Sequence, residues 1–137
     1  MKRTTIIDLL NQSVEKYSNN PFLWEKTSTE FTPTTYLETK QQTHIWSAGL
    51  MDLGVKMGDK IALLSEGRNA WIIGELAILH AGAINIPLSI KLEESNDLIF
   101  RIIHSEATYI LVSGGQLRKI RQIISDLDNL NLILLEW

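Results

Sequence analysis

The sequence predicts an α/β fold with a mostly parallel, doubly wound sheet. Residues 60–65 are a short apolar run behind a Gly-Asp turn, a pattern typical of a strand that is buried on both faces. Residues 70–81 are apolar almost all round and predict a buried helix, and residues 83–87 predict a second buried strand. A strand, a crossover helix and a strand within about thirty residues form a right-handed βαβ unit. Strand and helix patterns then alternate up to residue 135, in the order β-α-β-α-β-α-β, which indicates a parallel sheet with covering helices.

Three elements are expected before this unit. Thr4 or Thr5 is placed to cap a first helix. The apolar positions of that helix recur every three or four residues, at Ile6, Leu10, Val14 and Tyr17. Residues 22–32 predict a small hairpin of two short strands around a polar turn. Residues 33–34 open a long helix that ends at Gly54. Its inner stripe is expected at Tyr36, Thr39, Thr43, Trp46, Leu50 and Leu53.

The rest of the chain completes the alternation. Gly82 is expected to end the buried helix in a left-handed conformation, and Pro87 to end the second strand. A helix follows from Ser95 or an earlier residue, with its buried face expected at Ile99, Ile102 and Ile103. Residues 108–112 predict a third strand, rich in β-branched and aromatic residues. After a glycine turn comes a helix with its apolar face at Leu117, Ile120, Ile123, Ile124 and Leu127. Residues 130–135 predict the fourth strand.

Length and composition are those of an ordinary soluble domain. The chain has 137 residues, which favours one domain, residues 1–137, with a sizeable core. Its formal net charge of −3 gives no general attraction to nucleic acid or to anionic lipid. The absence of cysteine excludes disulfides, thiolate chemistry and cysteine metal sites. The apolar run near Met1 is too short for a signal peptide, and no run reaches the ~18 apolar residues of a membrane span. We therefore predict a cytoplasmic protein.

Two segments lie where α/β proteins bind ligands, but neither carries a strong motif. Residues 113–115, Ser-Gly-Gly, stand where a strand leads into a helix, and backbone amides there can hold a phosphate. They match neither G-x-G-x-x-G nor a P-loop, so we interpret them as a tight turn that requires glycine. Residues 66–69 follow the first core strand, at the edge where open sheets bind ligands. We interpret them as a solvated loop that caps the next helix.

The remaining polar residues suggest no active site. The histidines lie at no metal-ligand spacing and are expected to be exposed or hydrogen-bonded: His44, His80 and His104. Glu93 and Glu94 are adjacent, so they favour a helix start through its dipole and do not form an acid/base pair. Arg118, Lys119 and Arg121 are interpreted as a solvated basic face, with an acyl or nucleotide partner as the alternative. Residue chemistry therefore assigns no catalytic, cofactor-binding or metal-binding residue.

A family resemblance extends over nearly the whole chain. Residues 53–64, LGVKMGDKIALL, resemble the "LGvkpGDrVail" segment of the adenylate-forming acyl-CoA synthetases. Residues 68–71, RNAW, resemble the "N-r-p-E-W" turn common in the long-chain fatty acid members. Residues 76–88 follow the family's "lAilkaGavvvPly", residues 35–38 resemble "tYaEl", and residues 103–112 resemble "LndSeaklvfv". The sequence departs from the pattern at Met57, Ala70, Leu88 and Ser89, which bears on the subfamily and not on the family.

The resemblance implies an incomplete N-terminal part of the large domain of a long-chain fatty acid–CoA ligase. Such a parent would use ATP, Mg²⁺ and coenzyme A to convert a fatty acid into its CoA thioester through an acyl-adenylate, and it could contact a membrane peripherally. The family's phosphate loop, its acidic ribose-binding motifs and its catalytic lysine are expected beyond Trp137. The present segment is therefore expected to be an inactive scaffold with no bound cofactor.

Three alternatives remain at this point. The chain could be a remnant that has lost catalysis, part of an enzyme that activates another acyl or amino acid, or a free-standing flavodoxin-like binding module. An apolar edge at residues 132–135 is expected to be left unpaired, so we also predict that the chain self-associates through it.

Overall fold

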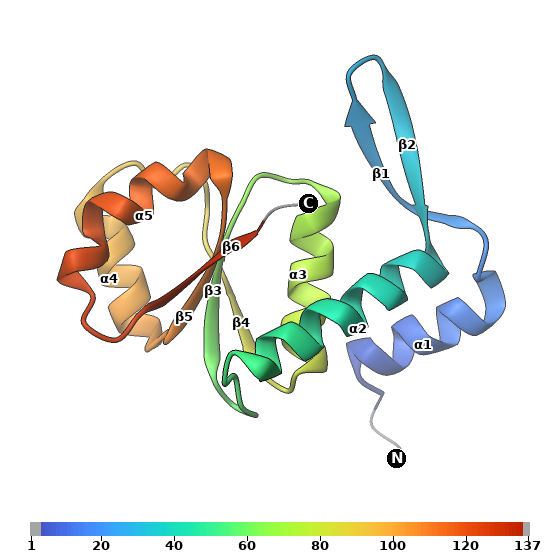
Figure 1. Ribbon diagram of the computed structural model, residues 1–137, viewed down its shortest axis with the longest axis horizontal. Helices are drawn as coiled ribbons and strands as arrows, with labels where there is room; N and C mark the ends of the chain where they lie inside the picture. Colours follow the sequence, from blue (N-terminus) through green and yellow to red (C-terminus); the bar gives the residue numbers. More distant parts are fainter. Residues whose placement is uncertain (1–3, 136–137) are drawn as a thin grey trace.

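The computed structural model describes residues 4–135 (Figure 1). The helices and strands, in chain order, are α1 (Ile6–Tyr17), β1 (Pro21–Thr27), β2 (Glu30–Thr35), α2 (Tyr36–Asp52), β3 (Lys60–Leu64), α3 (Asn69–His80), β4 (Ile84–Pro87), α4 (Ser95–Ser105), β5 (Tyr109–Ser113), α5 (Leu117–Ile123) and β6 (Asn131–Leu135). Short 3-10 turns, Gly114–Gln116 and Ile124–Asp126, flank α5.

The predicted α/β fold is confirmed. The main sheet has the strand order β4-β3-β5-β6, and all of its pairs are parallel. Alternate residues of β3 point to opposite faces, so Ile61 and Leu63 pack in one core with α2 and α3. Ala62 and Leu64 pack in a second core with α4 and α5. Helices therefore cover both faces of the sheet, as Figure 1 shows.

The N-terminal helices begin at threonine caps. Thr5 caps α1 through a reciprocal pair of hydrogen bonds with Asp8. Thr35 Oγ1 accepts from the Glu38 N–H at 3.2 Å, and the Glu38 carboxylate accepts from the Thr35 N–H at 2.8 Å. The prediction that residues 33–34 open α2 is therefore wrong. They belong to β2 of the predicted hairpin, and the Thr-x-x-Glu box places the start of α2 at Tyr36.

The buried face of α2 is more polar than predicted. Thr39, Thr43 and Ser47 are fully buried, whereas Leu53, assigned to the inner stripe, is exposed. The main neighbour of α2 is another helix, α3, so its inner face carries small side chains that let the two helices lie close together. Within residues 4–135, neither α2 nor any other helix combines the length and apolar character needed to cross a bilayer.

One strand and two helices differ from the predictions in the residues that they bury or expose. β4 was expected to be buried, but it is an edge strand and Ile84 is 45% exposed. Pro87 suits that edge, where a missing N–H costs no hydrogen bond. On α4, Leu98 and Ile102 face the core and Ile103 is 59% exposed, so the predicted face is rotated by one position. On α1, Leu10 and Val14 are buried as predicted, but Ile6 and Tyr17 are exposed.

We expect the Leu76→Ala variant to lose about 2–3 kcal/mol of the free energy of unfolding, the low end of the range for buried leucines. Leu76 is buried and packs with Leu10 and Val14 of α1, so α3 lies between the sheet and α1. The cluster formed by these three residues is small, so we expect the loss of unfolding free energy to lie at the low end of that range. Urea denaturation measures it, with the exposed Ile6→Ala as the control. A loss below about 1 kcal/mol would show that α1 does not cover α3.

Candidate functional site

The chain adds strands on one side of β3 and then on its other side, so the strand order reverses between β3 and β5. From β3 the chain crosses by α3 to β4 on one side, and from β4 it crosses back by α4 to β5 on the other side. The two crossover helices lie on opposite faces of the sheet. Open α/β sheets bind ligands in the crevice at such a switch point, at the carboxyl ends of the strands. The two loops singled out in the sequence, residues 66–69 and 113–115, meet there.

The carboxylate of Glu66 occupies this position. It accepts hydrogen bonds from Ser113 Oγ at 2.6 Å and from Gln116 Nε2 at 2.6 Å. A Cβ added to Gly115 would lie 2.5 Å from Glu66 Oε1, so a side chain there would force this carboxylate to shift. Neither Gly114 nor Gly115 has a positive φ, so the backbone of this turn does not require glycine as the sequence interpretation assumed. The two weak motifs form one cluster, which we call the Glu66 cluster: Glu66, Ser113, Gly115 and Gln116.

Residues 66–69 are not the fully solvated capping loop that the sequence suggested, since Asn69 is buried and Glu66 and Arg68 are partly buried. The N-cap residue of α3, Arg68, makes no side-chain capping hydrogen bond. Burial by itself raises the pKa of Glu66, but hydrogen bonds from Gln116 and Ser113 and the nearby charge of Arg68 outweigh burial and hold the pKa below its ordinary value. The group therefore stays ionised at neutral pH. A fixed negative charge opposes the binding of a phosphate at this switch point.

We expect the Glu66→Gln variant to lose less stability in acid than the parent chain. Because the folded chain lowers the pKa of Glu66, the unfolded chain binds the proton more readily. The stabilisation is thus present above the unfolded pKa and is lost as the pH falls through the folded pKa. Urea midpoints measured from about pH 5 to pH 3 test this, with the exposed Glu94→Gln as the matched control. Parallel curves for Glu66→Gln and the parent chain would contradict the assigned role of the Glu66 cluster.

The other end of the same loop binds the hairpin. Arg68 Nε lies 3.3 Å from Glu25 Oε1 of β1, and Asn69 Nδ2 donates to Thr34 Oγ1 of β2 at 3.2 Å. A hollow of about 420 Å³ lies between the loop and the hairpin. Residues 66–69 therefore divide their contacts between the switch point and the hairpin.

Two of the histidines meet, which the sequence did not reveal. His44 of α2 and His80 of α3 stack with their ring centroids 4.5 Å apart. Burial, followed by the charges of His44 and Lys40, lowers the pKa of His80 below its ordinary value. Their spacing in the sequence carries no signal, because the pair depends on how α2 docks on α3. Across residues 4–135, no group of three or more potential metal ligands is found.

The predicted solvated basic face is wrong at one of its three residues, Lys119. Arg118 and Arg121 are exposed, but Lys119 is only 8% exposed. Its ammonium group donates to the Ile90 carbonyl at 2.5 Å and to the Glu93 carboxylate at 2.8 Å. The long side chain thus buries its stem and ties α5 to the loop before α4. Glu93, expected to act on the dipole of that helix, is the ion-pair partner of Lys119.

Comparison with known proteins identifies the family. The sequence matches the family described as AMP-binding enzyme over residues 10–135. The chain belongs to this family. This chain is 26% identical, over 95% of its length, to the chloroplastic long-chain-fatty-acid–[acyl-carrier-protein] ligase AEE15 of Arabidopsis thaliana, of which it spans 18%.

Solved structures show the same fold at low sequence identity. A putative long-chain-fatty-acid CoA ligase from Rhodopseudomonas palustris aligns with a TM-score of 0.86 at 16% identity, over 97% of this chain and 33% of that one. The anthranilate CoA ligase AuaEII, solved in complex with anthranoyl-AMP, aligns with a TM-score of 0.83 at 20% identity, over 93% of this chain and 24% of that one. The chain thus has the fold of the N-terminal domain of adenylate-forming ligases and spans a minor part of each relative.

Proposed function

We propose that this chain is the N-terminal, incomplete part of the large domain of an AMP-forming long-chain fatty acid–CoA ligase. The observation that carries the proposal is the family match over residues 10–135. The long-chain substrate is favoured by the Arabidopsis relative, whose name states a long-chain fatty acid, and by residues 68–71, which resemble the turn of the long-chain members. The AMP-containing complex of the structural neighbour supports the use of ATP.

In the whole enzyme, the fatty acid carboxylate would attack the α-phosphate of ATP and release pyrophosphate. The thiol of coenzyme A would then displace AMP from the acyl-adenylate to give the thioester. Charge on the α-phosphate must be stabilised by positioned donors and by a cation such as Mg²⁺. The glycine turn at the switch point does not suit that task, because it faces the negatively charged Glu66 carboxylate.

The role that we propose for this chain is therefore structural. Its sheet, with α2 and α3 on one face and α4 and α5 on the other, forms one wall of the large domain. Phosphate binding and acid recognition would come from chain beyond residue 137. A cytoplasmic location stays a prediction, since the relatives include a chloroplastic enzyme.

The substrate is tested with the full reading frame that contains this chain. Pyrophosphate release from ATP and Mg²⁺ would be measured with hexadecanoate, benzoate, anthranilate and a mixture of amino acids, followed by thioester formation with coenzyme A. We expect hexadecanoate to give the fastest release and the thioester to form only with coenzyme A. A stop codon directly after Trp137 would contradict the proposal of an incomplete domain.

The second candidate is an enzyme of the same family that activates another acid. The anthranilate CoA ligase matches this fold nearly as well as the putative long-chain-fatty-acid CoA ligase does, so the fold does not separate the two. Faster release with benzoate, anthranilate or an amino acid than with hexadecanoate would favour this candidate. The free-standing flavodoxin-like module loses its support, because the family match covers nearly the whole chain.

A further inference from the structure

The interface between α2 and α3 buries polar groups that hydrogen bonds do not fully satisfy. The buried face of α2 carries the hydroxyls of Thr39, Thr43 and Ser47. Thr39 Oγ1 donates to the Thr35 carbonyl at 2.8 Å. Within residues 4–135, neither Thr43 Oγ1 nor Ser47 Oγ has a hydrogen-bond partner. A buried hydroxyl without a partner is destabilising, so α2 is held on α3 less firmly than an apolar helix face would be.

Two histidines meet at the rim of this interface. The imidazole of His44 on α2 stacks on that of His80 on α3, with the ring centroids 4.5 Å apart and the ring planes 23° apart. Both side chains are exposed, so protons reach them without unfolding of either helix. The stack therefore joins the two helices through groups that can change their charge in mild acid.

The charges near this stack favour its neutral form. Burial where the helices meet, followed by the charges of His44 and Lys40, lowers the pKa of His80. Lys40 precedes His44 by one turn of α2, so the two side chains share a helix face. A proton taken up by one imidazole thus meets the charge of Lys40 and, in acid, the charge of the other imidazole.

The carboxylates of the neighbouring elements are bound elsewhere. Glu75 of α3 accepts a hydrogen bond from a side-chain amide of β4 at 3.1 Å. Asp8 of α1 belongs to the capping box of its own helix, and Asp59, before β3, accepts from a backbone N–H of its own turn at 2.7 Å. In the part of the chain that the structure describes, the charges that shift the pKa of His80 are all cationic. A doubly protonated stack is therefore not neutralised by an acidic side chain.

We propose that the stack of His44 on His80 is an acid-sensitive latch, which holds α2 on α3 while both imidazoles are neutral and loosens this contact when both are protonated. Two like charges at the separation of the rings repel each other, and moving the helices apart relieves the repulsion. Because the folded chain lowers the pKa of His80, the unfolded chain binds the proton more readily. The stabilisation is present above the unfolded pKa and is lost as the pH falls through the folded pKa.

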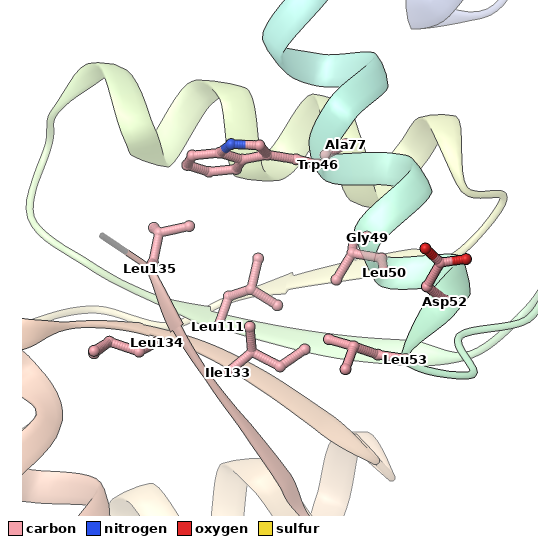
Figure 2. Close-up of a pocket in the computed structure, with 10 residues that line it drawn as sticks. All are labelled: Trp46, Gly49, Leu50, Asp52, Leu53, Ala77, Leu111, Ile133, Leu134 and Leu135. Carbon is pink, nitrogen blue, oxygen red and sulfur yellow. The ribbon is translucent and has the colours of Figure 1, made fainter. Parts of the chain in front are cut away.

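The latch lies apart from the apolar groove of about 470 Å³ between α2 and the strands β5 and β6. Figure 2 shows Trp46 of α2 over this groove. His44 and Trp46 are two residues apart on the helix, so their side chains point to nearly opposite sides of α2. The latch therefore does not depend on what covers the groove, or on the proposed ligase function. Self-association through residues 132–135 stays a prediction.

Urea midpoints at about pH 7.5 and about pH 5.5, on either side of the ordinary histidine pKa, test the latch. We expect the midpoint of the parent chain to fall by about 0.3 M or more between these two conditions, and that of His80→Gln to fall clearly less. The matched control is His104→Gln, since His104 stacks on the uncharged ring of Phe100, at 5.3 Å. This control should follow the parent chain. Circular dichroism checks that the variants are folded, and His44→Gln, which removes the other ring, should behave as His80→Gln does.

Two further measurements place the effect at the helix interface. In an NMR titration, His44→Gln should raise the pKa of His80 toward its ordinary value, whereas His104→Gln should leave it unchanged. In the parent chain, the amide protection factors of residues 43–47 should be at least about threefold lower near pH 5.5 than near pH 7.5, and this change should be absent in His80→Gln. Parallel midpoints for the parent chain and His80→Gln, equal effects of His80→Gln and His104→Gln, or protection of residues 43–47 that does not change with pH would each overturn the proposal.

Discussion

The Leu63→Ala variant is expected to lose about 3–5 kcal/mol of the free energy of unfolding, the largest loss among the substitutions considered. Leu63 is 0% exposed and lies in β3, which is paired on both sides. Its side chain packs beneath Gly74 of α3 and beside Leu111 of β5. Gly74 has no side chain to move into the space, so the substitution leaves a cavity in addition to the lost burial. Urea denaturation at neutral pH measures the loss.

The matched control is Ile103→Ala, which removes a similar side chain from a position that is 59% exposed. We expect its unfolding free energy to stay within about 0.5 kcal/mol of that of the parent chain. The sequence pattern had placed Ile103 on the buried face of its helix, so the comparison also tests that correction. Equal losses for the two variants would mean that β3 is not the centre of the sheet.

Much of the fold is predictable from the sequence because buried parallel strands are apolar runs bounded by turn residues. The first core strand was predicted at residues 60–65 and is observed at Lys60–Leu64. The same signal does not distinguish a central strand from an edge strand. The apolar sequence of β4 predicts a buried strand, yet the strand order places β4 at the edge of the sheet. The start of α2 lies later than predicted because the Thr35–Glu38 capping box, and not Pro33, sets the first turn of the helix.

The candidate site was predictable only in its parts. The sequence singled out the loops around Glu66 and Gly115 separately, since each follows an apolar strand. Their meeting depends on β3 and β5 being neighbours, and strand order is not a local property of the sequence. The stack of His44 on His80 and the burial of Lys119 likewise depend on how helices and loops pack together.

The second large effect is an absence of catalysis: the isolated chain should not adenylate a fatty acid at any Mg²⁺ concentration. Its sequence contains neither a P-loop nor the Ser/Thr/Gly-rich phosphate loop of the family that it resembles. The Ser113–Gly115 turn at the switch point faces the Glu66 carboxylate, whose pKa is held low by hydrogen bonds from Gln116 and Ser113 against the effect of burial. A phosphate would have to displace this negative charge.

ATP–pyrophosphate exchange with hexadecanoate is the measurement that tests the scaffold role most directly. We predict that the purified 137-residue chain exchanges label at the rate of a blank without protein. The Leu63→Ala variant, purified in the same way, is the control, because a contaminating ligase would survive in it while activity of this chain would fall with its stability. Exchange that rises with the concentration of the parent chain and is reduced in that variant would place an adenylation site within these residues and contradict the scaffold role.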